Sequence, residues 1–320
     1  MTSILVPYDG SPAAQEAIPY AVRLARAAGA RLILTRACPD DLDLLYAAEL
    51  SAQALRQRIR RCGVEVTLRV RAGEPVDIVS QELRTWQPDW MVLSSHGDSG
   101  VGRWLFGGVA DALLRTAHVP TILVPPHHRT WPEGQKPRLL LPMDGSAESE
   151  HALPALRRLI AFLGARVFLL RVVEPPIPSP YAYDQCAPYV EFDPHVELER
   201  ARAYLREVAS GLKLGPGDAE CHATVGAPGI SIPTFAREHH ADLVLLTLRG
   251  AGRTAATLGG TALGTLRYAA VPLVLVPVPS PVLQAEQDTA PASAVTHSPA
   301  GAAADAVAEA AAVTRPAGTR

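Results

Sequence analysis

Short apolar runs alternate with longer segments of helical period along the first 125 residues of the chain. The apolar runs have the length of strands and fall at residues 4–8, 31–37, 64–70, 90–94 and 121–124. The segments between them repeat apolar residues every three or four positions and fall at residues 12–28, 44–61, 75–86 and 107–117. Strands that alternate with helices are typical of βαβ units around a parallel sheet. The pattern therefore predicts a doubly wound, Rossmann-like α/β domain with five parallel strands and four helices.

Residues that begin and end helices stand at the borders of these segments. Ser11 can cap the first helix with Pro12 at its first position, and Gly29 follows the last apolar position of that helix. Gly63 ends the second helix in the same way. Residues 90–94 are almost continuously apolar, which is typical of a central strand covered on both faces.

The same pattern returns in the second half of the chain. Residues 4–36 match residues 139–171 at 14 of 33 positions without a gap. Residues 107–125 match residues 259–277 at 11 of 19 positions. A repeat of this length is a whole domain rather than one unit of a solenoid. Any function must therefore be sought in one fold that is used twice.

The repeats predict a first copy of the domain at residues 1–126 and a second copy at residues 137–278. We expect the two copies to pack as an intramolecular pseudo-dimer, and further association into a homo-oligomer stays open. Residues 174–194 contain six prolines and are predicted to form a long surface loop, either an ordered decoration or a lid or partner site. Residues 280–320 are rich in Ala and Pro and have almost no large apolar side chains, which predicts a disordered tail.

Charge and cysteine content exclude several classes of function. The formal net charge of -2, from 30 basic and 32 acidic residues, predicts no binding to nucleic acid or to an anionic membrane. No apolar stretch approaches the roughly 18 residues of a membrane span, and the first strand begins too early to leave room for a signal sequence. We therefore expect a cytoplasmic protein. The four cysteines lack the spacing of metal ligands, so no metal or redox site is predicted.

Small and polar residues follow the first and fourth predicted strands of each copy. In the first copy these are Asp9-Gly10-Ser11 and a Gly-rich stretch, residues 94–103, that leads to Gly107-Gly108. Ligands of doubly wound sheets bind beyond the carboxyl ends of the strands, where the strand order reverses. A loop of small residues before a helix presents free N–H groups to an anion. The sequence therefore predicts a ligand that carries phosphate.

These motifs resemble the universal stress protein family in its tandem form, whose domains have an adenine nucleotide α-hydrolase-like fold. The likeness covers residues 1–125 and 137–277. Nucleotide-binding members of that family carry Gly-x2-Gly-x9-Gly-[Ser/Thr] after the fourth strand, and the first copy has Ser94-x2-Gly97-x9-Gly107-Gly108. The second copy has Thr247-x2-Gly250-x8-Gly259-Gly260, which is one residue shorter. Both copies thus depart from the motif at its first and last positions.

The resemblance implies that each copy binds ATP or a related adenine nucleotide, with or without Mg2+. Asp9 or Asp144 would accept hydrogen bonds from the ribose or adenine, and the glycine loop would hold the phosphates. The implied contact residues of the first copy are Pro7, Asp9, Ala37, Ser94, His96, Gly97, Gly107, Gly108 and Val109. Those of the second copy are Pro142, Asp144, Val172, Thr247, Arg249, Gly250, Gly259, Gly260 and Thr261.

The leading hypothesis is a stress-response regulatory protein in which the bound nucleotide changes the exposure of a partner surface, without chemistry. One alternative is a scaffold or dimerisation module with degenerate sites. Another is a phosphoryl-transfer enzyme, but the chain lacks Gly-x4-Gly-Lys-[Ser/Thr] and has no hydroxyl at Gly108 or Gly260 to reach Mg2+. We expect no catalytic residue and at most weak ATP hydrolysis. Asp9 and Asp144 could also only cap their own turns.

Overall fold

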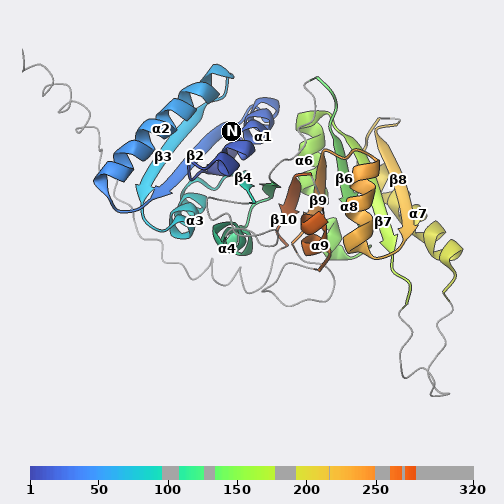
Figure 1. Cartoon of the computed structure of the whole chain (residues 1–320). Helices are drawn as coiled ribbons and strands as arrows, with labels where there is room; N and C mark the ends of the chain where they lie inside the picture. The colour runs from blue at the N-terminus through green and yellow to red at the C-terminus, as the bar shows by residue number, and fades with distance from the viewer. Residues whose placement is uncertain are drawn as a thin grey trace, which may run out of the picture. The chain divides into compact units, whose positions relative to one another are not determined.

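A computed structural model describes residues 1–95, 108–125, 134–176, 192–215, 217–248, 260–268 and 271–278 (Figure 1). The elements of the first copy are β1 (Ser3–Pro7), α1 (Pro12–Ala28), β2 (Arg31–Cys38), α2 (Leu42–Arg61), β3 (Val66–Ala72), α3 (Pro75–Trp86), β4 (Trp90–Ser94), α4 (Gly108–Thr116) and β5 (Thr121–Val124). Those of the second copy are β6 (Arg138–Pro142), α5 (Ala147–Glu150), α6 (Leu153–Leu163), β7 (Arg166–Val173), α7 (Pro194–Gly211), β8 (Ala219–Val225), α8 (Pro228–Glu238), β9 (Leu243–Thr247), α9 (Gly260–Tyr268) and β10 (Leu273–Val276).

The predicted borders of α1 are confirmed. The Ser11 hydroxyl accepts a hydrogen bond from the Ala14 N–H at 3.0 Å, and Pro12 stands in the first turn. Gly29 ends the helix in the left-handed conformation, with φ of 58°. The second helix begins two residues earlier than predicted, at Leu42, because Asp41 caps it by accepting the Leu44 N–H at 3.0 Å.

The helix that follows the first strand of the second copy is split into α5 and α6, whereas the sequence predicted the same order of elements as in the first copy. The Ser149 hydroxyl donates to the Ser146 carbonyl at 2.8 Å, and a ring nitrogen of His151 lies 2.8 Å from the Ala147 carbonyl. The His151 ring occupies the Ala147 carbonyl, and the His151 N–H, which would use that carbonyl in a continuous helix, donates to Glu148 instead; the Ser146 carbonyl still accepts the Glu150 N–H at 3.3 Å. Pro154 does not by itself explain the break, because Pro19 at the equivalent position of the first copy lies inside the continuous helix α1.

The strands of each copy are parallel and doubly wound, as predicted. The order of the whole sheet is β3-β2-β1-β4-β5-β10-β9-β6-β7-β8. Strand β1 pairs with both β2 and β4, so the strand order reverses between β1 and β4, and the corresponding position in the second copy lies between β6 and β9. Helices α1, α2, α6 and α7 pack on one face, and α3, α4, α8 and α9 pack on the other.

The two five-stranded sheets join into one sheet of ten strands among the residues described. Strand β5 pairs with β10 in the antiparallel direction, with Thr121 opposite Leu275 and Leu123 opposite Leu273. Because strands within each copy are parallel and the joining pair is antiparallel, the carboxyl ends of the two sets of strands lie at opposite edges of the sheet. The candidate ligand sites of the two copies therefore lie at opposite ends of the strand direction.

Contacts between the copies also involve the helices next to the central strands. Helix α1 packs against α6, and the Arg158 guanidinium of α6 lies 2.7 Å from the Asp89 carboxylate of the first copy. The other oxygen of Asp89 accepts the Ser3 N–H at 2.9 Å. Burial raises the pKa of Tyr20 in α1, and the charge of Asp242 in the second copy raises it further. Asp89, just before β4, thus pairs with an arginine of the second copy, and Asp242, just before β9, acts on a tyrosine of the first copy.

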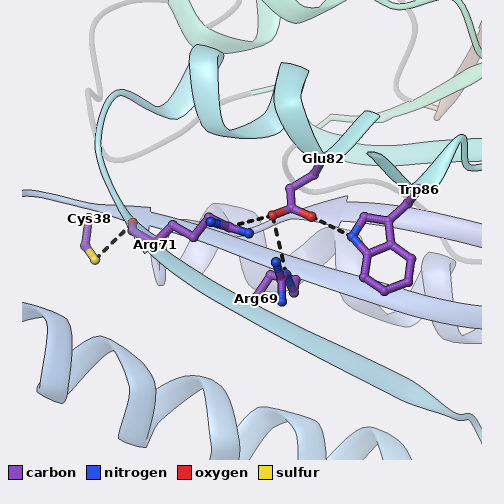
Figure 2. A network of polar contacts seen from close by, with 5 residues as sticks. All are labelled: Cys38, Arg69, Arg71, Glu82 and Trp86. Atoms are coloured by element: carbon purple, nitrogen blue, oxygen red, sulfur yellow. Dashed lines mark hydrogen bonds and ion pairs between the residues drawn. The ribbon is translucent and has the colours of Figure 1, made fainter. Parts of the chain in front are cut away.

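A buried carboxylate fixes α3 to the edge strand β3. Glu82 is 1% exposed, and Figure 2 shows three donors converging on it. Its oxygens accept hydrogen bonds from Arg71 Nε at 2.9 Å and from Trp86 Nε1 at 2.6 Å, with Arg69 Nε at 3.5 Å. The Cys38 thiol donates to the Arg71 carbonyl at 3.4 Å, so the same strand is also held to β2.

The second copy fills the same place with rings instead of charges. At the positions that correspond to Arg69, Glu82 and Trp86, it has His222, Phe235 and His239. The rings of Phe235 and His239 are stacked with centroids 3.9 Å apart, and the His222 ring lies 4.9 Å from Phe235. One fold therefore uses two different solutions, ionic and aromatic, to join its third helix to its edge strand.

Several predictions fall outside the residues that the structure describes. These concern the tail at residues 280–320, most of the linker after residue 126, and most of the loop at residues 174–194. Residues 1–278 form one compact unit. None of the helices in the described ranges is long and apolar enough to cross a membrane.

Candidate functional site

The carboxyl ends of β1, β2 and β4 bring together the first-copy residues predicted to contact a ligand. Pro7, Ala37 and Ser94 stand at or next to the ends of these strands and are half-buried, and Asp9 follows β1 and is exposed. Because β1 and β4 are neighbours at the point where the strand order reverses, the predicted position of the site is also the position favoured for ligands in this fold. Pro142, Asp144, Val172 and Thr247 occupy the equivalent positions of the second copy.

The turn after each central strand is held by its own aspartate, as the structural alternative predicted. One Asp9 oxygen accepts the Ser11 N–H at 2.8 Å, and Gly10 has φ of +94°, which favours glycine. The second oxygen of Asp9 has no partner among the described residues. Asp9 therefore has a structural role in the turn and also keeps one oxygen free to accept a hydrogen bond from a ligand.

Asp144 is more heavily engaged than Asp9. One of its oxygens accepts the Ser146 N–H at 2.9 Å and the Ser146 hydroxyl at 2.5 Å. Desolvation raises the pKa of the Asp144 carboxyl, but the hydrogen bonds from Ser146 outweigh it and leave the pKa below its ordinary value. The second copy thus offers a carboxylate that is ionised but already satisfied in part by its own turn.

The start of α4 completes the described part of the first site. Gly108 is the first residue of that helix, and both Gly108 and Val109 are exposed. A Cβ added at Gly108 would meet no atom of the described residues within 4 Å. Thr261 is exposed at the equivalent place of α9, one residue after Gly260. Six predicted contact residues lie outside the described ranges, namely His96, Gly97, Gly107, Arg249, Gly250 and Gly259.

An arginine lies over each aspartate turn, and sequence reasoning missed both. A Cβ placed on Gly10 would lie 2.9 Å from Arg36 Nη2, and a Cβ placed on Gly145 would lie 2.5 Å from Arg171 Nη1. The two arginines are 135 residues apart, which is the repeat distance of the first strands, so the repeat itself could have revealed them. Within the described residues no group of three His, Cys, Asp or Glu side chains could hold a metal ion.

A model of the universal stress protein family matches residues 1–125 and 137–277, which together make up most of the chain. The chain belongs to the universal stress protein family. Universal stress protein Rv2623 of Mycobacterium tuberculosis is 32% identical over 166 residues, which are 47% of this chain and 56% of that relative. The match therefore spans about half the length of this curated relative.

Solved structures agree with the tandem α/β architecture. A universal stress protein from Archaeoglobus fulgidus has a TM-score of 0.66 and 19% identity, and the match covers 86% of this chain and 98% of that one. The cytoplasmic domain of a prokaryotic cation chloride cotransporter has a TM-score of 0.52 and 11% identity over 86% of this chain and 94% of that domain. At these identities the likeness shows the fold alone, and function must be argued from the site.

Two residue types in this universal stress protein depart from the nucleotide-binding motif. Ser94 ends β4, is half-buried, and pairs with Val124 of β5 in the sheet. Gly108 provides a backbone N–H at the helix start but no hydroxyl. The described part of the site thus keeps main-chain donors and lacks one side-chain donor.

Proposed function

We propose that this universal stress protein binds ATP or a related adenine nucleotide at the carboxyl edge of β1 and β4, and acts as a regulatory protein. The observation that carries the proposal is a matched pair of groups at this edge. Asp9 keeps one carboxylate oxygen without a partner among the described residues, and α4 begins with exposed backbone at Gly108. Asp9 follows β1 and α4 follows the neighbouring strand β4. A hydrogen-bond acceptor beside a helix N-terminus suits a nucleoside and its phosphate.

The residues present fit such a ligand. The oxygen of Asp9 would accept a hydrogen bond from a ribose hydroxyl or an adenine amino group. Pro7 and Ala37 offer apolar surface to a base, and the first N–H groups of α4 would donate to phosphate oxygens. Backbone donors and the helix dipole together favour a negative charge at this point. When bound, the nucleotide would add the charge that these donors are oriented to receive.

We propose binding rather than catalysis. Transfer of a phosphoryl group requires a positioned base and a metal held near the phosphates. In the described part of the chain, Asp9 is tied to its turn through one oxygen and faces no histidine or lysine partner. A binding role needs only that the nucleotide favours one arrangement of the protein over another.

The second copy is proposed as the weaker site. The carboxylate of Asp144 is already engaged by the N–H and hydroxyl of Ser146. Both bonds fall on one oxygen and leave the other accessible, but a carboxylate that shares its charge with two donors is a weaker acceptor for a third, and a typical hydrogen bond contributes about 0.5–1.5 kcal/mol net. We therefore expect the first copy to bind a nucleotide about two- to tenfold more tightly than the second.

A scaffold function is the second candidate, and the pairing of β5 with β10 favours it. This pairing lets one chain build the two-copy sheet by itself, as an intramolecular pseudo-dimer. A protein with that architecture could present a partner surface without any ligand. The two candidates differ in one respect, because only the first requires nucleotide binding.

Isothermal titration with ATP, with and without Mg2+, tests the proposal. Asp9→Ala removes the acceptor and the turn bond, whereas Asp9→Asn keeps an oxygen for the Ser11 N–H. Asp77→Ala is the matched control, because Asp77 is an exposed acid at the start of α3. We expect saturable binding by the unmodified protein and by Asp77→Ala, with the largest loss in Asp9→Ala. Absence of binding at millimolar ATP would leave the scaffold function.

A further inference from the structure

Helix α2 carries large apolar side chains on the side that points away from the sheet. Leu42 is 84% exposed, Tyr46 is 66% exposed and Leu50 is 50% exposed. These residues are spaced four positions apart, so they follow one side of the helix. Figure 1 shows α2 beside β3, which is the outermost strand of the first copy. The buried residues of α2, on the side that packs on β2 and β3, are Ala48, Ala52, Leu55 and Ile59.

The equivalent helix of the second copy, α7, has a charged outer surface instead. The buried positions of the two helices align with an offset of 153 residues. At the positions of Tyr46 and Leu50, α7 has Glu199 and Ala203, and Glu199 pairs with Arg202 on the same helix at 2.5 Å. The fold therefore does not require apolar side chains on this surface. Their presence on α2 alone is typical of a surface that meets another protein.

The charges of α2 are ordered along the same side of the helix. Asp43 lies in the first turn and Arg61 in the last, and both are exposed. They are 18 residues apart, which is about five turns of 3.6 residues, so they lie on one line along the helix. Leu50 and Ala54 lie within about 20° of that line. Asp43 and Arg61 form no ion pair within the described ranges, so both charges remain available to a partner.

An order of acid, apolar residues and base is complementary to itself when the helix is reversed. In an antiparallel pair centred on Ala52, Asp43 stands nine positions before the centre and faces Arg61, nine positions after the centre, of the second molecule. Leu50 then lies against Ala54 of that molecule, whose small side chain lets the helices approach closely. The same charges also complement the dipole of α2, but the dipole gives no reason for exposed apolar side chains between them.

We propose that two molecules of this protein associate through α2, packed antiparallel about a two-fold axis near Ala52. Strands β5 and β10 are already paired on both sides within one molecule, so a second molecule needs a different surface. Each partner contributes one helix about 30 Å long, and an interface of this kind buries about 1,200 Å² or less in total. The expected dissociation constant is therefore micromolar, about 1–100 μM. This association does not depend on nucleotide binding.

Analytical ultracentrifugation of the full chain between about 1 and 300 μM measures this association. Leu50→Glu should raise the dissociation constant at least about tenfold, because the change enters a symmetric interface twice and places a charge against apolar surface. Ala203→Glu is the matched control, since Ala203 is exposed at the equivalent position of α7 and should leave the constant unchanged. Tyr46→Lys is a second variant on the same surface and should act like Leu50→Glu. Circular dichroism shows that each variant keeps its fold.

Charge reversal tests the antiparallel arrangement. Asp43→Arg and Arg61→Asp should each weaken the dimer about two- to tenfold, and the double variant should restore it. The two positions are about 27 Å apart within one helix, beyond the reach of a screened charge, so restoration must come from pairing between molecules. A double variant that is no better than the single variants would overturn the proposal, as would a dimer that Leu50→Glu leaves unchanged. A monomer at every concentration would also overturn it and leave the surface of α2 for a different protein.

Discussion

Replacing Glu82 tests whether its buried carboxylate holds α3 to the edge of the sheet. Glu82 is 1% exposed and accepts hydrogen bonds from Trp86 Nε1 at 2.6 Å and Arg71 Nε at 2.9 Å. A hydrogen bond to a charged group contributes about 1.5–3 kcal/mol. The Arg71 side chain is 39% exposed, so water can partly replace its hydrogen bond to Glu82. That bond therefore contributes about 1.5 kcal/mol or less. Glu82→Ala also leaves a small cavity. The expected loss of unfolding free energy is about 3–5 kcal/mol, the usual cost of breaking a buried pair.

Glu82→Gln is the milder variant, because the amide oxygen can still accept the Trp86 N–H while the charge is lost. We expect this variant to lose about 1–3 kcal/mol. Urea denaturation followed by circular dichroism gives the free energy of unfolding, and calorimetry gives the midpoint temperature. For a chain of this size, a loss of about 3–5 kcal/mol corresponds to a fall of roughly 6–20 °C.

The second copy supplies the compensating variant. Its corresponding residues are transplanted in Arg69→His, Arg71→Thr, Glu82→Phe and Trp86→His, which removes every charge of the network at once. Replacing all members of a buried ion network together leaves no unpaired charge behind, and such replacements are often close to neutral when they pack well. The transplant should therefore be more stable than Glu82→Ala. A transplant that is no more stable than Glu82→Ala, or a Glu82→Ala variant within about 0.5 kcal/mol of the unmodified protein, would refute this reasoning.

Three further predictions concern single residues. Gly108→Ser adds a hydroxyl where a new Cβ meets no atom of the described residues within 4 Å, so ATP affinity should rise about two- to tenfold in a titration; weaker binding would place the phosphates elsewhere. Gly264→Val should lower the free energy of unfolding, measured in urea, by about 1–3 kcal/mol, because a Cβ there would lie 3.0 Å from the α8 backbone. Gly211→Ala should cost less, because its Cβ would lie 4.0 Å from the tip of an arginine side chain. Ser146→Ala should raise the pKa of Asp144 in a carboxyl NMR titration. Since the folded pKa of Asp144 lies below the unfolded value, its contribution to stability is present above about pH 4 and is lost as the pH falls through the folded pKa. Ser146→Ala should therefore show a smaller acid-dependent loss, and an unchanged pKa would contradict the assigned hydrogen bond.

Local signals explain why the elements of the first copy could be predicted from the sequence. A serine before a proline and a glycine after the last apolar position define α1, because each supplies a group or conformation that a helix end requires. The split between α5 and α6 could not be read in this way. It accompanies the bond between the His151 ring and the Ala147 carbonyl, and histidine is also common inside continuous helices.

Longer-range features were predictable only in part. The repeat indicates two copies, but the apolar pattern does not specify which strand edges meet, so the antiparallel pairing of β5 with β10 required the structure. Asp9 was predicted at the site because it follows a strand end. Arg36 was missed because one polar residue near the end of a strand fits the ordinary alternation of exposed positions. Its lack of an anionic partner among the described residues becomes visible only when its neighbours are placed.

A crystal structure of the protein grown with millimolar ATP tests the central claim most directly. The account predicts adenine against Pro7 and Ala37, a ribose or adenine hydrogen bond to the second oxygen of Asp9, and phosphate at the first N–H groups of α4. Nucleotide bound away from the carboxyl ends of β1 and β4, or no nucleotide in either copy, would contradict it.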